Sequence, residues 1–84
     1  MKLFKEIITI NHSYTIDEHI IFKNEEYQYI YDNEKERNDH IQQKQLEGFK
    51  SDEKVKINIG TLTNPNYVWI GIFHKQTQNK LKLK

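Results

Sequence analysis

The chain lacks cysteine and alanine altogether, and its 84 residues include one proline, one tryptophan and three glycines. Without cysteine it has no disulfide and no thiolate metal site. Because secreted domains of this size are usually cross-linked by disulfides, we expect a cytoplasmic protein. No apolar run at the start has the length of a signal peptide, and none elsewhere approaches a membrane span. The length predicts a single compact domain over residues 1–84.

The missing residue types also argue against most enzymes. Ser13 and Ser51 are the only serines, and Ser13 cannot use the adjacent His12 because neighbouring strand residues point to opposite faces. Three glycines form no phosphate-binding loop. No two histidines have a metal-binding spacing, so we predict no metal site and no cofactor; they are His12, His19, His40 and His74. A metal-free ribonuclease is the one enzyme class that this size permits, and the lone Arg37 in an acidic segment argues against it. We therefore expect a non-enzymatic protein.

The near-neutral net charge of +1 conceals two charged poles. Residues 17–53 hold eleven of the twelve acidic residues against five basic ones, which is a formal charge of −6. Residues 54–84 hold six lysines and no acid. Charge that is separated in this way bears on the choice of partners and not on the fold. It also allows a homodimer that forms pole to pole and dissociates in high salt.

Alternation of apolar and polar residues predicts strands in the first half of the chain. Residues 4–16 alternate with one clearly apolar face. Two further extended runs, residues 20–23 and 27–31, are separated by Asn24-Glu25-Glu26, which has the length and composition of a hairpin turn.

A helix is expected next, over residues 34–47. Asp32 or Asn33 is suited to be its N-cap, and acidic residues in its first turn favour the positive end of the helix dipole. Gly48 can take the left-handed conformation that ends a helix. Ile41 and Leu46 form only a thin apolar stripe, so most of the helix should face water.

The second half returns to strands. Residues 54–63 alternate, Asn64-Pro65-Asn66 indicates a turn, and residues 67–75 are apolar on both faces, as in a central strand. A turn over residues 76–79 would lead to a lysine-rich edge strand or tail over residues 80–84. The predicted fold is α+β: an antiparallel sheet of five or six strands, in the order β-β-β-α-β-β with a possible sixth edge strand, and one helix packed on one face.

Two surfaces are candidate binding sites. The first combines tyrosines on one strand face with the acidic start of the helix, and it would bind another protein: Tyr27, Tyr29, Tyr31, Asp32, Glu34 and Glu36. The second combines aromatic rings for base stacking with lysines for phosphates, and it would bind single-stranded RNA or DNA: Lys54, Lys56, Tyr67, Trp69, Phe73 and Lys75. If the helix covers the face that bears Trp69 and Phe73, these rings are core residues instead.

The composition adds a resemblance. Abundant Ile, Lys and Asn with no Ala indicate an AT-rich gene, and in this the chain is similar to small proteins that phages and plasmids of low-GC bacteria carry. Many of those proteins bind and block a host protein, anti-CRISPR proteins among them. The resemblance implies a protein-binding inhibitor or modulator with a host protein as its partner. Single-stranded nucleic acid binding is the alternative function.

Overall fold

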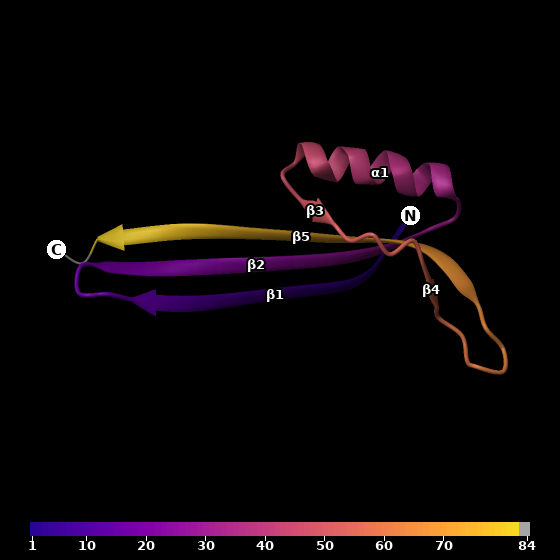
Figure 1. The fold of residues 1–84 in the computed structure, drawn as a ribbon, viewed down its shortest axis with the longest axis horizontal. Coiled ribbons are helices and arrows are strands. Elements are labelled where there is room, and N and C mark those ends of the chain that lie inside the picture. Colours follow the sequence, from indigo (N-terminus) through magenta and orange to yellow (C-terminus); the bar gives the residue numbers. More distant parts are fainter. Residues whose placement is uncertain (83–84) are drawn as a thin grey trace.

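The computed structural model describes residues 1–82 and contains one antiparallel sheet and one helix (Figure 1). The elements in chain order are β1 (Lys2–Tyr14), β2 (Glu18–Tyr31), α1 (Glu34–Leu46), β3 (Lys50–Ser51), β4 (Lys56–Asn58) and β5 (Tyr67–Lys82). The strands are ordered β1-β2-β5-β3, and β4 also pairs with β5. The predicted α+β class is confirmed: strands precede and follow one helix, which packs on one face of the sheet.

Two predicted turns are wrong, because β2 and β5 are long unbroken strands. Asn24 pairs with Thr9 of β1 on one side and with Gln76 of β5 on the other, where a hairpin turn was expected. The turn predicted over residues 76–79 likewise lies inside β5. Residues 80–82 continue β5, and residues 83–84 of the predicted edge strand lie outside the described residues. Polar residues on both faces are compatible with a strand here, since nothing described covers this part of the sheet.

The strand predicted over residues 54–63 is shorter than expected. Only β4 is extended, and a loop follows that contains the predicted Asn64-Pro65-Asn66 turn. The Asn58 side chain organises this loop, because its Oδ1 accepts hydrogen bonds from the backbone N–H groups of Gly60 (2.9 Å) and Asn66 (2.8 Å). A side chain that satisfies two loop donors replaces the ladder that a longer strand would have supplied.

The helix is confirmed at both ends. Asn33 is the N-cap, and its Oδ1 accepts a hydrogen bond of 2.8 Å from the backbone N–H of Glu36. Gly48 follows the last turn with a φ of 91°, which an L side chain rarely adopts. The helix faces the sheet with buried Arg37 and His40. Of the predicted apolar stripe, Ile41 is partly buried but Leu46 is exposed.

The molecule has two parts that share the same long strands. At one end α1 covers β2 and β5, and the buried apolar residues lie there: Tyr31, Ile70, Ile72 and Phe73. Residues 70–73 of β5 are buried in succession, as predicted for a central strand with two covered faces.

From this end a three-stranded ribbon projects, made of residues 7–14 of β1, residues 18–26 of β2 and residues 74–82 of β5 (Figure 1). Every residue of β1 is exposed. The radius of gyration is 17.2 Å and the extents are 58 × 30 × 18 Å, whereas a compact domain of this length has a radius of about 12 Å. Within residues 1–82 we find no helix with the length and apolar character that crossing a membrane requires.

Candidate functional site

Strand register brings parts of the two predicted sites together beneath the helix. Tyr27 pairs with Phe73, Tyr29 with Gly71, and Tyr31 with Trp69. Directly paired residues of antiparallel strands project to the same face, and α1 packs on this face. We call it the helix-side face. The tyrosine row and the aromatic strand are therefore neighbours in one interface.

The centre of this interface is a buried hydrogen bond between a tyrosine and a histidine. The Tyr31 hydroxyl lies 2.6 Å from His40 Nδ1, and the His40 ring contacts Tyr29 and Phe73 edge-on, with ring centroids 4.7 and 5.2 Å apart. Burial raises the pKa of Tyr31 far above its usual value. Phe73 is 0% exposed and Tyr31 is 5% exposed. These two predicted site residues are core residues and cannot meet a partner directly.

Arg37 connects the helix to two separate segments of the chain. Its Nε donates a hydrogen bond to the Ile70 carbonyl (2.6 Å), and its Nη2 donates to the Lys54 carbonyl (3.2 Å). The guanidinium also reaches the Asn38 side chain at 3.3 Å. Arg37 therefore holds α1, β5 and the segment that leads into β4 in one arrangement.

Arg37 and His40 are the structurally important residues that the sequence reasoning missed. Most of their neighbours in the sequence are polar, which is typical of a solvated helix. Arg37, His40 and Lys44 are spaced i, i+3 and i+7, which places them on one side of a helix. That spacing is the signal in the sequence, and it is a weak one because charged side chains are rarely buried.

Histidine burial makes the stability of this interface depend on pH. Burial lowers the pKa of His40, Lys44 lowers it further, and Glu47 and Glu36 partly oppose both effects. A histidine in the unfolded chain has a pKa of about 6.5. Below that pH the unfolded chain therefore binds more protons than the folded chain, in which the pKa of His40 is lower. The contribution of His40 to the free energy of unfolding is therefore fully present above about pH 6.5. It decreases as the pH falls and is lost below the pKa of His40 in the folded state.

We expect urea unfolding at about pH 7.5 and about pH 5.5 to show a larger loss of stability for the wild type than for His40→Gln. Glutamine can still bond to the Tyr31 hydroxyl but does not titrate. Equal losses in the two proteins would contradict the assignment.

The acidic residues of the first predicted site differ in how far they are buried. Glu36 is partly buried and forms an ion pair of 2.5 Å with the Met1 amino group. Asp32 and Glu34 are exposed. Tyr27 and Tyr29 are half-buried, and the Lys44 ammonium lies 5.9 Å from the centre of each ring. A partner could therefore reach only the edges of this surface.

The second predicted site is divided between two places. Lys56 pairs with Trp69 across β4 and β5, and its ammonium lies 4.3 Å from the centre of a Trp69 ring. Tyr67 is exposed at the same hairpin. Lys75 lies elsewhere: its ammonium lies 5.1 Å from the centre of the Phe49 ring and donates to the Glu47 carbonyl. Lys56, Tyr67 and Trp69 thus remain together, without Phe73 or Lys75, and Lys54 lies in the segment just before β4.

The ribbon has exposed apolar side chains on both faces. On β1, Ile8, Ile10 and Tyr14 project to the helix-side face, beyond the reach of α1, while Ile7 projects to the opposite face. Ile10 is 57% exposed. β1 pairs only with β2 among the described strands, so its outer edge presents unpaired N–H and C=O groups.

The tip of the ribbon carries a stacked ring cluster. Tyr14 and His19 are stacked at 4.2 Å, and His12 Nδ1 lies 2.8 Å from His19 Nε2. A hydrogen bond between two imidazoles needs one donor and one acceptor nitrogen. The cluster therefore holds β1 and β2 in register next to the turn that joins them.

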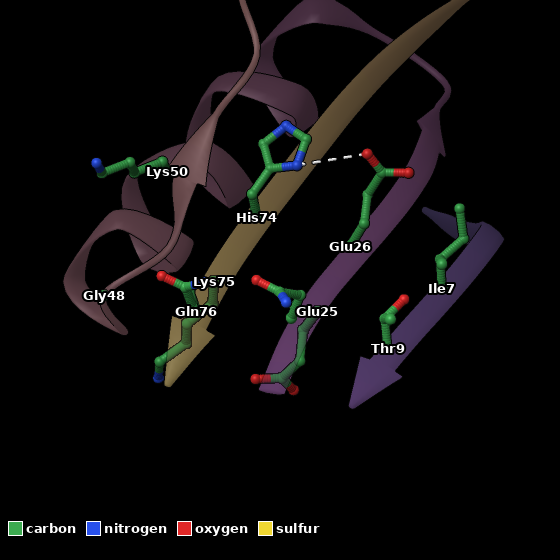
Figure 2. Close-up of a pocket in the computed structure, with 10 residues that line it drawn as sticks. Ile7, Thr9, Glu25, Glu26, Gly48, Lys50, His74, Lys75 and Gln76 are labelled. Carbon is green, nitrogen blue, oxygen red and sulfur yellow. Dashed lines mark ion pairs between the residues drawn. The ribbon is translucent and has the colours of Figure 1, made fainter. Parts of the chain in front are cut away.

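A shallow hollow of about 600 Å³ lies where the ribbon meets the helix-capped end (Figure 2). Glu26 and His74 point toward each other across paired strands, with 3.4 Å between carboxylate and imidazole (Figure 2). Lys50 and Lys75 add positive charge to the lining, and Glu25 adds negative charge. The mixed signs give no preference for a charged small ligand. Across residues 1–82, no three His, Asp or Glu side chains lie close enough to hold a metal ion.

Comparison of the chain with protein-family models, with characterised proteins and with solved structures finds no match.

Proposed function

We propose that the chain is a non-enzymatic protein-binding domain that inhibits or modulates another protein, and that it binds through the ribbon. One observation carries the proposal: β1 is exposed along all 13 residues and its outer edge is unpaired among the described strands. A strand edge of this kind is a template onto which another chain can add a strand.

The faces of the ribbon support the same function. Soluble proteins rarely leave contiguous apolar surface without a use for it, and here the exposed Ile8 and Ile10 are neighbours on the helix-side face of the ribbon, with the exposed Ile7 on the opposite face. Edge pairing would supply main-chain hydrogen bonds, and these side chains would supply apolar contact. The exposed Asp32 and Glu34 of the predicted acidic site stay available as a second contact at the other end of the molecule.

Site-specific photo-crosslinking in cells tests this proposal. A photoreactive residue at position 8, on the ribbon, is expected to give a discrete adduct with another protein. The same residue at position 62 is the control, because Leu62 is 98% exposed but lies in the loop after β4. Equal adducts from both positions, or none from position 8, would contradict the ribbon as the binding surface.

A second candidate function rests on the β4–β5 hairpin, which carries Lys56, Tyr67 and Trp69 and is preceded by Lys54. Lysines beside aromatic rings are typical of single-strand binding sites. A base that stacks on Trp69 must first displace the Lys56 ammonium from the ring. If the chain works in this way, short single-stranded RNA or DNA changes Trp69 fluorescence and added salt abolishes the effect. Unchanged fluorescence in low salt would exclude this function.

A further inference from the structure

The two long edges of the ribbon differ in how well they are protected against pairing. Along residues 75–82 of β5, no strand within the described part of the chain pairs on the outer side, and this edge carries Lys75, Lys80 and Lys82. Lysines along an edge discourage the addition of another strand, as do prolines and bulges. The β5 edge is therefore protected by positive charge.

The β1 edge has such protection only at its beginning. Lys2 and Lys5 lie there, and the register shifts between Leu3 and Lys5, which marks a bulge or irregularity. From Glu6 to Tyr14 the strand has nine residues, no lysine and no proline, and Glu6 is its only carboxylate. An exposed edge of this length, with a single carboxylate at its start, can readily pair with another strand.

We propose that the β1 edge pairs with β1 of a second copy of this chain, antiparallel about a two-fold axis at Ile10, to form one continuous sheet in which the two ribbons together have six strands. The inference rests on the proposed function, in that it takes the β1 edge to be a binding surface. In the dimer the second copy fills this edge, so another protein binds the exposed faces of the ribbon or displaces the second copy. A two-fold axis perpendicular to the sheet keeps both helices on the same side and closes the assembly as a dimer.

The sequence of this segment is complementary to itself in that register. On the helix-side face Ile10 meets Ile10 of the second copy, Ile8 meets His12, and Glu6 meets Tyr14, whose hydroxyl can donate to the carboxylate. On the opposite face Ile7 meets Ser13. No like charges face each other, and the two-fold places the irregular, lysine-bearing start of each strand outside the paired segment.

The charges along the two edges also favour pairing of β1 with β1 over pairing of β1 with the β5 edge of a neighbouring copy. Pairing β1 with the β5 edge of a neighbour is head to tail and would continue into a filament, and it would bring the lysines of β5 into the seam. The β1 seam contains no ion pair, so the dimer should resist salt, unlike a dimer held by the two charged poles.

The oligomeric state of the full chain tests the proposal. Light scattering after size exclusion is expected to give twice the 10.2 kDa chain mass, also in about 1 M NaCl. Ile10→Lys places two like charges opposite each other and should yield a monomer, as should Ile10→Glu. Mixing these two variants should restore a dimer, because opposite charges then meet at the axis. Ile16→Lys is the matched control, since Ile16 is 83% exposed but lies outside the paired segment.

Several results would overturn the inference: a monomeric wild type, a dimer that Ile16→Lys disrupts as strongly as Ile10→Lys, variants that do not combine on mixing, or species larger than a dimer. Far-UV circular dichroism confirms that each variant is folded. A monomeric wild type that still crosslinks to another protein from position 8 overturns the dimer but leaves the proposed function standing. A monomer that gives no crosslink overturns both.

Discussion

A Phe73→Ala variant is expected to lose about 3–5 kcal/mol of unfolding free energy, the usual cost of truncating a buried phenylalanine. Phe73 is fully buried and packs between Tyr29 and His40 where the helix meets the sheet. The truncation removes apolar contacts and leaves a cavity that the paired strands cannot close. Since small domains have only about 5–15 kcal/mol in total, a large fraction of the variant should be unfolded or easily unfolded.

Urea unfolding followed by Trp69 fluorescence measures this effect. Phe4→Ala is the matched control: it removes the same atoms, but Phe4 is 49% exposed on β1, and surface substitutions usually change stability by less than about 0.5 kcal/mol. If both variants lose the same free energy, the core does not lie where the helix covers the sheet.

An Arg37→Met variant should show the second-largest loss, of about 2–4 kcal/mol. The two lost hydrogen bonds from a charged group contribute about 1.5–3 kcal/mol each, and the variant regains part of this because it no longer buries a guanidinium charge. Methionine keeps an apolar stem beneath the helix but cannot donate to the carbonyls of Ile70 and Lys54. Both carbonyls then lose a partner, and the segment before β4 loses its attachment to α1.

Lys35→Met is the control for this variant. Lys35 lies on the same helix with its side chain 89% exposed and in an i,i+4 pair with Asp39, and exposed pairs of this kind contribute little to stability. Thermal unfolding of both variants measures the two losses of stability. A loss for Arg37→Met no larger than that for Lys35→Met would show that the buried guanidinium does not stabilise the fold.

The elements that sequence reasoning predicted correctly are those with local chemical signals. The helix limits follow from Asn33, whose side chain caps the first turn, and from Gly48, whose positive φ ends the last one. The first strand was also placed correctly to within two residues at each end, because its alternation is sustained. Each of these signals can be read within a few residues of the element that it defines.

The long strands could not be predicted from local signals. Asn24-Glu25-Glu26 has the composition of a turn, yet its residues are paired on both sides. Sequence rules assume that one face of a strand is buried and must be apolar. In the ribbon neither face is covered, so polar residues carry no penalty, and only the register with β1 and β5 keeps the segment extended.

Local signals also fail to predict which residues of the candidate sites are exposed. The sequence placed Tyr31 and Phe73 in two different binding surfaces, and the structure buries both under one helix. Both faces of β5 carry apolar residues, so the alternation alone could not decide which face α1 covers. The exposed edge of β1 was also not predictable, because the position of a strand within a sheet depends on pairing between distant segments and not on its own residues.

Because β2 and β5 run unbroken from the helix-capped end to the ribbon tip, one strand experiences two different environments. Amide hydrogens near residues 70–73 exchange with solvent only when the core opens, whereas those near residues 77–82 require only fraying of an uncovered sheet. Hydrogen-exchange protection should therefore decline along a single strand instead of changing from one element to the next. The cooperative unit of this protein is then shorter than its longest elements, and its tip can open and close while the helix stays in place.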